Sequence, residues 1–287
     1  MIIIKNVTTA DEFLASIRRV GNIKFIQRDI YNWYDVILLR LGIKQNITVL
    51  FKDGSKKGVS NFGEFLKVWS GYSPDSKMEM DKYLDKMHVS DSYISFKYKG
   101  RKIKFAYVRE PDIAGTIGLI NEVFFNDEYG ETPVKGKTVI DVGATIGDVA
   151  TYFVMNGAKK VYCYEAHSES VRLARKSLKL NNLGEKIKFF EKFCGKRFLE
   201  QVSKEYDLSD AVLKMDVEGS EYDILLDCDV SVLRRFSYMV IEYHKGYMNL
   251  EKKLRDAGFQ VSHTMPDIHE ASDMCVGLIY ARRKDVR

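Results

Sequence analysis

The pattern of apolar and polar positions divides the chain into two parts. From residue 138 onward, short apolar runs alternate with segments whose apolar residues recur every three or four positions, the period of an amphipathic helix. This alternation predicts an α/β fold of five strand–helix units followed by two strands with no helix between them. The expected strands are 138–142, 161–164, 187–190, 211–215, 238–241, 259–263 and 275–282. They imply a seven-stranded, mostly parallel sheet with helices on both faces and an antiparallel last strand.

The front part of the chain has a different pattern. Helical periodicity marks residues 11–20, 31–41 and 62–69, whereas strict alternation marks two hairpins, one around Asp53-Gly54 and one around Lys99-Gly100-Arg101. We therefore expect a small α+β accessory region at 1–108 and a larger α/β domain at 109–287. No catalytic constellation is visible in the accessory region.

The segment that follows the first strand of the α/β domain carries the clearest chemical signal. Asp141 ends that strand, and Gly143-Ala144-Thr145-Ile146-Gly147 leads into the next helix. Glycines allow the backbone to turn sharply and to approach a ligand closely, and the free N–H groups of a new helix point into the same space. This loop is typical of a nucleoside-binding site.

Polar residues also follow the later strands. Glu165 ends the second expected strand, Asp216 the fourth, and Glu242 and His244 the fifth. Ligands of parallel sheets bind outside the carboxyl ends of the strands, where these side chains meet. A carboxylate in the position of Glu165 can accept hydrogen bonds from both hydroxyls of a ribose, so we expect Glu165 to bind a ribose.

Two classes of cofactor use such an edge. A dinucleotide site favours G-x-G-x-x-G, but the loop lacks the middle glycine. S-adenosylmethionine has no pyrophosphate and carries a sulfonium and an ammonium group, which favour the nearby carboxylates of Asp141 and Asp216. The acids therefore favour the cationic cofactor.

Residues 119–282 resemble the FkbM family of class I S-adenosylmethionine-dependent methyltransferases. The resemblance rests on Asp141–Gly147, on Lys214–Glu221 with its Asp-Val-Glu-Gly-x-Glu segment, on 122–129 and on Ile241–His244. Thr145 departs from the family, which usually has Asn there, and 189–194 is bulkier than usual. The resemblance implies a Rossmann-like fold and O-methylation of a hydroxyl on a sugar, a glycan or another small molecule.

The resemblance also implies roles for individual residues. The cofactor is expected to contact Asp141, Gly143, Ala144, Thr145, Gly147, Glu165, Ala166, Phe193 and Asp216. The expected catalytic residues are Asp216, Glu218, Glu242 and His244, with His244 or Asp216 as general base and Glu218 orienting the acceptor. A less favoured alternative is a divalent metal held by Asp216, Glu242 and His244. Glu221 is expected to be only a charge that complements the helix dipole.

Composition leaves further alternatives open. Residues 1–110 hold 20 Lys and Arg against 12 Asp and Glu, so the front of the chain is basic. The main alternative is therefore an RNA methyltransferase that binds RNA through this basic region. Nucleic acid is nevertheless not the favoured partner, because the basic residues form no dense block. An NAD-dependent oxidoreductase and a non-catalytic binding protein are further alternatives. No apolar run is long enough to cross a membrane, the four cysteines have no metal-ligand spacing, and the expected location is the cytoplasm.

Overall fold

The computed structural model describes residues 30–40, 43–52, 54–61, 64–65, 68, 86–90, 92–107, 113–264, 267–269 and 274–284. The chain forms two compact units, one of Met1–Lys82 with Glu270–Asp273 and one of Tyr83–His269 with Met274–Arg287. The helix expected at 11–20 and most of the helix expected at 62–69 lie outside the described residues.

The described part of the first unit is a hairpin with one helix. Strand β1 (Ile47–Leu50) pairs antiparallel with β2 (Lys56–Val59), and helix α3 (Trp33–Arg40) shares a buried apolar cluster with them. Asn32 joins the helix to the hairpin, because its amide donates to Thr48 O and accepts from Leu50 N, both at 2.8 Å. The first expected hairpin and the helix at 31–41 are therefore present.

The second unit contains the predicted seven-stranded sheet. Its strands lie in the order β8-β7-β6-β9-β10-β13-β11, and a short strand β12 pairs with β13. Neighbours from β8 to β10 are parallel, whereas β13 is antiparallel to both β10 and β11. The bounds are β6 (Thr138–Val142), β7 (Lys160–Glu165), β8 (Ile187–Glu191), β9 (Ala211–Met215), β10 (Phe236–Tyr243), β11 (Phe259–His263), β12 (Asp267–His269) and β13 (Met274–Arg283). The predicted Rossmann-like fold class is confirmed.

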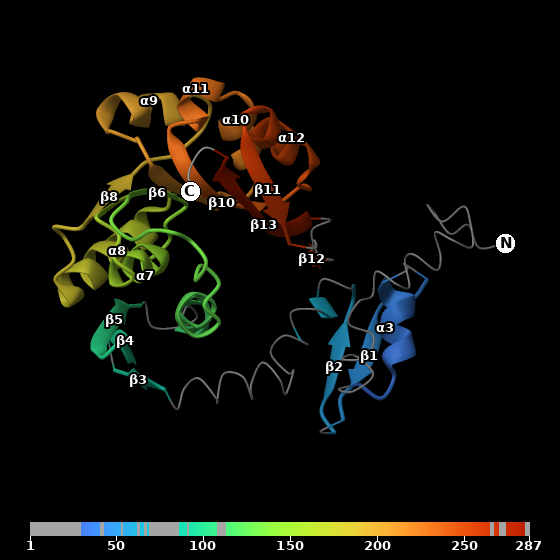
Figure 1. The fold of residues 1–287 in the computed structure, drawn as a ribbon. Coiled ribbons are helices and arrows are strands. Elements are labelled where there is room, and N and C mark those ends of the chain that lie inside the picture. The colour runs from blue at the N-terminus through green and yellow to red at the C-terminus, as the bar shows by residue number, and fades with distance from the viewer. Residues whose placement is uncertain are drawn as a thin grey trace. The chain divides into compact units, whose positions relative to one another are not determined.

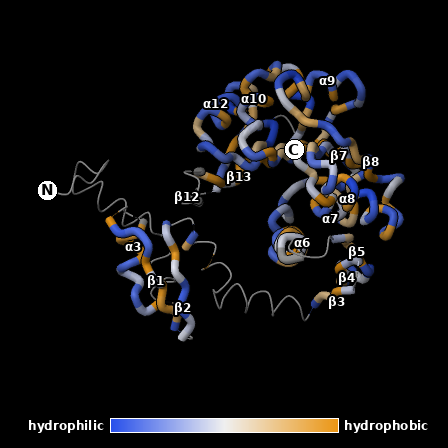
Figure 2. Tube along the Cα trace, turned by 180° about the vertical axis from the view of Figure 1, so that it is seen from behind, coloured by the Kyte–Doolittle hydropathy of each residue, from blue (hydrophilic) through white to orange (hydrophobic). Residues whose placement is uncertain are grey.

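Helices cover both faces of this sheet (Figure 1). Helices α9 to α12 gather on one face, and α7 and α8 lie on the other. Hydrophilic and hydrophobic stretches alternate along α9 and α12, as expected for helices that bury one side (Figure 2). The bounds are α7 (Asp148–Met155), α8 (Ser168–Asn181), α9 (Phe198–Glu205), α10 (Glu221–Leu226), α11 (Val230–Leu233) and α12 (Met248–Asp256).

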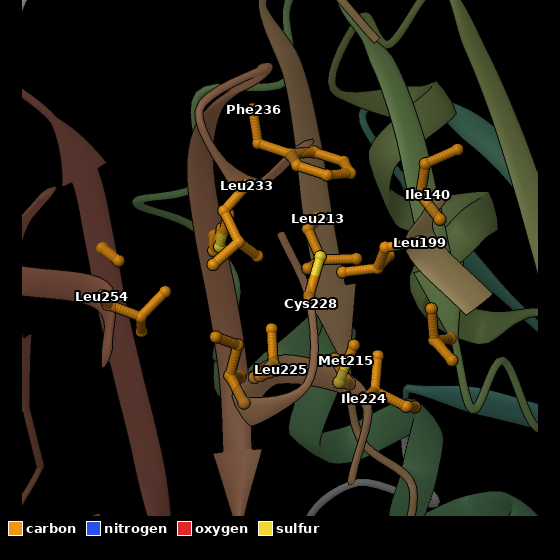
Figure 3. Packing of buried hydrophobic residues seen from close by; sticks show 14 of the residues in the cluster. Ile140, Leu199, Leu213, Met215, Ile224, Leu225, Cys228, Leu233, Phe236 and Leu254 are labelled. Atoms are coloured by element: carbon orange, nitrogen blue, oxygen red, sulfur yellow. The ribbon is translucent and has the colours of Figure 1, made fainter. Parts of the chain in front are cut away.

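A large apolar cluster joins the sheet to the helices of the first of these faces. Leu213 of β9, Leu199 of α9 and Leu225 of α10 are fully buried in it (Figure 3). Fully burying a side chain of this kind contributes about 1.5–3 kcal/mol. The cluster thereby fixes β9, whose carboxyl end leads to Asp216.

A small antiparallel sheet belongs to the same unit. It consists of β3 (Met87–Val89), β4 (Tyr93–Tyr98) and β5 (Arg101–Ala106). Phe96 and Phe105 contact Phe124 with ring centroids 4.9 and 5.8 Å apart. Phe124 lies in the π-helix η1 (Asn121–Phe125), which continues helix α6 (Ile113–Ile120). The hairpin that the sequence assigned to the accessory region therefore lies in the same compact unit as the large sheet.

Helix α8 protects the outer edge of the small sheet. Asn181 accepts from Lys104 N at 2.9 Å and donates to Lys104 O at 2.6 Å, and Ser177 Oγ accepts from Ala106 N at 2.9 Å. Side chains thus pair backbone groups of β5 that a further strand would otherwise pair.

The described residues contain no helix that is long and apolar enough to span a membrane. Cys163, Cys194 and Cys228 are buried free thiols, and Cys275 is a partly buried one.

The contact between α8 and β5 gives a test of the fold. We expect Asn181→Ala to lower the free energy of unfolding by about 1–3 kcal/mol, because it leaves the N–H and C=O of Lys104 without partners. Urea denaturation followed by circular dichroism measures the change. Lys176→Ala, at an exposed position of the same helix, is the control and is expected to change stability by less than about 0.5 kcal/mol. Equal stability of the two variants would contradict the assigned contact.

Candidate functional site

A cavity of about 260 Å³ lies at the carboxyl edge of the large sheet. Strand β6 has β7 on one side and β9 on the other, so the strand order reverses here, and such a switch point is where α/β sheets bind ligands. Gly143, Thr145, Glu165, Ala166, Phe193 and Asp216, six of the nine residues expected around the cofactor, line the cavity. Tyr164, Lys192, Cys194, Val217, Glu218 and Ser220 complete its wall.

The glycine loop has a backbone that requires its glycines. Gly143 has a φ of 77°, and a Cβ on it would lie 1.6 Å from Asp216 O. Gly147 has a φ of 79° and precedes helix α7. The loop can therefore pass directly over the end of β9 only because residue 143 lacks a side chain.

Glu165 is held in a fixed orientation at the end of β7. One carboxylate oxygen accepts from Thr145 N at 3.0 Å, and the other accepts from His167 N at 2.7 Å. Each oxygen keeps a second lone pair for a ligand. The carboxylate thus faces the cavity as expected.

The far wall of the cavity is formed after β8. Phe193 is 70% exposed although it is a large apolar side chain. Tyr164 stacks on Phe190 with a centroid distance of 5.1 Å. An exposed ring at the rim and a buried Tyr164 stacked on the partly exposed Phe190 suit a flat heterocycle.

Lys214 is a buried cation in the central strand β9, and its side chain is only 3% exposed. Its Nζ donates to Gly143 O at 2.8 Å and lies 3.5 Å from Asp141 Oδ1 and 3.8 Å from Asp216 Oδ2. Desolvation opposes its charge, but the surrounding carboxylates outweigh this and raise the pKa of Lys214. No role was expected for Lys214 from the sequence, although an ionisable residue within an apolar strand indicates a structural or functional role.

Asp141 lies behind the cavity wall. It is fully buried and pairs with Lys214, and burial raises the pKa of its carboxyl to about 6. Neither Asp141 nor Ala144 nor Gly147 lines the cavity. Asp141 lies in strand β6, and Ala144 and Gly147 belong to the glycine loop, so these three expected cofactor residues shape the site without lining the cavity.

A buried Glu–His pair lies beside the cavity. Glu221 is fully buried, and its Oε1 lies 3.2 Å from His244 Nδ1 and accepts from His244 N at 2.9 Å. Its other oxygen accepts from Gly219 N at 2.8 Å. Because Nδ1 faces Glu221, Nε2 of a neutral His244 carries the lone pair. The expectation that Glu221 only complements a helix dipole is corrected by these contacts.

His244 Nε2 points to carboxylates at the cavity. It lies 3.4 Å from Glu218 Oε2 and 3.9 Å from Asp216 Oδ1. Desolvation lowers the pKa of His244, but the hydrogen bond and charge of Glu221, followed by the charges of Glu218 and Asp216, outweigh it and raise that pKa above its usual value. The arrangement can hold a proton at Nε2.

Further carboxyl groups surround Asp216 and form an acidic cluster of Asp216, Glu242, Glu122 and Glu128. Burial, and then the charge of Asp216 and a hydrogen bond with it, raise the pKa of Glu242 to about 8. Desolvation raises the pKa of Glu122 and of Glu128, although part of each side chain reaches solvent, and the charge of Asp216 adds to both shifts. The pKa of Glu242 therefore favours the protonated form of this carboxyl at neutral pH.

Three residues have the chemistry of a cation site. Asp216, Glu218 and His244 each offer a ligand atom, and these atoms lie within 4.8 Å of one another. The sequence predicted Glu242 as the third ligand of such a metal site, whereas the structure offers Glu218. The Glu242 carboxyl is instead hydrogen-bonded to Asp216. Two carboxylates and an imidazole suit several divalent metals.

Comparison with known proteins gives few relatives. No family model matches the chain. Uncharacterized protein 65 of Sulfolobus islandicus filamentous virus (isolate Iceland/Hveragerdi) is 28% identical over 127 residues, which are 44% of this chain and 72% of that protein. Uncharacterized protein 158B of Sulfolobus islandicus rod-shaped virus 1 is 29% identical over 131 residues, 46% of this chain and 75% of that protein.

Solved structures with a similar fold include proteins in complex with S-adenosylhomocysteine or AdoMet and a SAM-dependent methyltransferase. M. capricolum TrmK in complex with S-adenosylhomocysteine has a TM-score of 0.42 at 16% identity, over 56% of this chain and 68% of that one. M. jannaschii TYW2 in complex with AdoMet has a TM-score of 0.42 at 14% identity, over 68% and 89%. A SAM-dependent methyltransferase from Agrobacterium tumefaciens has a TM-score of 0.42 at 12% identity, over 68% and 71%. At such TM-scores these likenesses carry no argument about the residues of this chain.

The buried Lys214–Asp141 pair gives a testable prediction. We expect Lys214→Met to lower the free energy of unfolding by about 3–5 kcal/mol at pH 8, because it leaves the Asp141 carboxylate buried without a counter-charge. Burial already raises the pKa of Asp141 to about 6, so the acid form is favoured in the folded state at low pH. The loss is therefore expected to be smaller at pH 5 than at pH 8, as measured by urea denaturation.

The double variant Asp141→Asn/Lys214→Met is the control for this prediction. It removes both charges and is expected to recover a large part of the lost stability, so the two changes should be non-additive. Additive losses at both pH values would show that the two side chains do not interact.

Proposed function

We propose that this protein is an S-adenosylmethionine-dependent methyltransferase that methylates a hydroxyl group of a sugar, a glycan or another small molecule. The observation that carries the proposal is the cavity at the strand switch point, with an oriented Glu165 carboxylate on one side and the acidic cluster on the other. A nucleoside with a positively charged tail fits this distribution of groups.

The cavity wall offers a partner for each part of the cofactor. The Glu165 carboxylate would accept hydrogen bonds from the ribose hydroxyls, and the Phe193 ring and the chain at Lys192–Cys194 would contact the adenine. Gly143 and Asp216 line the opposite end, where a carboxylate suits a sulfonium and an ammonium group. The bound cofactor supplies an electrophilic methyl group.

A dinucleotide is a poorer fit. A pyrophosphate would need the N-terminus of α7, but Asp148 stands in the first turn of that helix and is 2% exposed. Burial raises the pKa of Asp148 to about 7, so its carboxyl is about half ionised at that pH and opposes an anion increasingly above it. The acidic start of α7 therefore suits a methyltransferase better than a dinucleotide-dependent oxidoreductase.

The Glu221–His244 pair suggests how a hydroxyl acceptor is activated. Glu221 orients His244, whose Nε2 takes the hydroxyl proton while Glu218 and Asp216 align the acceptor. Positioning and proton removal are the two requirements for methylating an aliphatic hydroxyl. The FkbM-like segment from Asp216 to Glu221 supplies three of these carboxylates, which is why we extend the proposal to the FkbM family.

The ribose role of Glu165 is tested by calorimetry. We expect Glu165→Ala to weaken S-adenosylmethionine binding at least about tenfold, because a charge-assisted hydrogen bond contributes about 1.5–3 kcal/mol. Glu191→Ala is the matched control, since Glu191 is paired with Glu165 on the neighbouring strand but does not line the cavity. Unchanged affinity in the Glu165 variant, with the fold intact, would remove the ribose assignment.

The role of Glu221 is tested without knowing the acceptor. We expect Glu221→Gln to lower the pKa of His244, because Glu221 provides the largest contribution that raises it. Since a general base must be neutral, the acidic limb of a pH–rate profile would then move to lower pH. NMR titration of the protein labelled at its five histidines measures the pKa directly.

Glu218→Gln is the comparison variant for this titration. It removes a weaker charge contribution to the same imidazole and is expected to produce a smaller shift in the same direction. A His244 pKa that is identical in the wild type and in the Glu221 variant would contradict the orienting role of Glu221.

A further inference from the structure

Three electron-rich atoms converge at one end of the cavity of the large sheet. His244 Nε2 lies 3.4 Å from Glu218 Oε2 and 3.9 Å from Asp216 Oδ1, and one ligand atom of each residue lies within 4.8 Å of the others. Bonds of about 2.0–2.2 Å to a common ion place its ligand atoms about 3–4.4 Å apart. The two spacings around Nε2 therefore suit a single bound cation.

The imidazole of His244 has the orientation that a metal ligand requires. The fully buried Glu221 accepts from His244 N at 2.9 Å and lies 3.2 Å from Nδ1. Histidines that bind metals are oriented in this way, because their second ring nitrogen donates to a carboxylate or a carbonyl. With its proton on Nδ1, the ring turns the lone pair of Nε2 toward Asp216 and Glu218. His244 is 3% exposed, and among the described residues Nε2 takes part in no hydrogen bond.

A lone pair that faces two carboxylates is unfavourable unless a positive charge lies between them. A proton on Nε2 or a divalent cation can supply this charge. Both distances from Nε2 to the carboxylate oxygens exceed the length of an ordinary N–H···O hydrogen bond, about 2.7–3.2 Å. A proton would therefore pair poorly with either oxygen, whereas an ion between the three atoms contacts all of them.

The site is open to an incoming ion. The side chain of Glu218 is 79% exposed and that of Asp216 is 28% exposed, and both residues line the cavity. Lys214 Nζ lies 3.8 Å from Asp216 Oδ2, but Asp141 lies closer to it, at 3.5 Å, and compensates its charge. Three protein ligands leave further positions on the ion for water or for another oxygen.

We propose that Asp216, Glu218 and His244 bind a divalent transition-metal ion such as Zn²⁺. An imidazole ligand favours such an ion over Mg²⁺ and Ca²⁺, which prefer oxygen ligands. The proposal goes beyond methyl transfer and does not rest on it, since no step of it uses the cofactor. One lone pair cannot hold a proton and an ion together, so the metal-loaded protein would lack the free base that the proposed methyl transfer uses.

Calorimetric titration of the full chain with zinc chloride, after bound metal has been removed with a chelator, tests the proposal. We expect one equivalent of Zn²⁺ to bind, at least about a hundredfold more tightly than Mg²⁺. Glu218→Ala is expected to weaken Zn²⁺ binding at least about tenfold, because it removes a charged ligand. The exposed position of Glu218 makes this a variant that is expected to fold.

Asp223→Ala is the matched control. It removes an exposed carboxylate from helix α10 that is no member of the triad, and it is expected to bind Zn²⁺ within about twofold of the wild type. Equal losses in the Glu218 and Asp223 variants, or no Zn²⁺ binding by the wild type, would overturn the proposal. Zn²⁺ binding no tighter than that of Mg²⁺ would overturn the assignment to a transition metal.

NMR of the protein labelled at its five histidines shows which imidazole binds the ion. We expect one equivalent of Zn²⁺ to shift the ring signals of His244, which are assigned with His244→Asn, and to leave those of the other four histidines in place. Shifts confined to the other histidines would place the ion elsewhere and overturn the proposal. Glu165→Ala is expected to bind Zn²⁺ normally, so that failure of the cofactor assignment and failure of the metal site are distinguishable.

Discussion

The charge of Lys214 is the constraint on which the candidate site depends. A lysine in the central strand of a covered sheet loses its hydration, and only close opposite charges and hydrogen bonds can compensate for that loss. The chain provides them from three directions, through Asp141 of the neighbouring strand, Asp216 at the end of its own strand and the carbonyl of Gly143. The ammonium group thereby ties the glycine loop to the ends of β6 and β9.

This arrangement determines which ligand charge the cavity accepts. Lys214 compensates Asp141 internally, so Asp141 contributes little field to the cavity. Asp216 is farther from Lys214 and lies near Glu242, Glu122 and Glu128. The exposed side of the site is therefore acidic although a lysine lies behind it. Such a site favours a cationic group near Asp216 and disfavours a pyrophosphate.

The sequence predicted those features that depend on local periodicity. The seven strands of the large sheet and the second hairpin follow from apolar runs and alternation, and Glu165 and Asp216 lie at the strand ends as expected. Strand β3, helix α11 and strand β12 were missed because three or four residues are too short for a period to be visible. The place of the second hairpin in the unit of the large sheet was not visible in the sequence, because the contact of Phe96 with Phe124 joins distant segments. The role of Glu221 depends likewise on its contact with His244, 23 residues away.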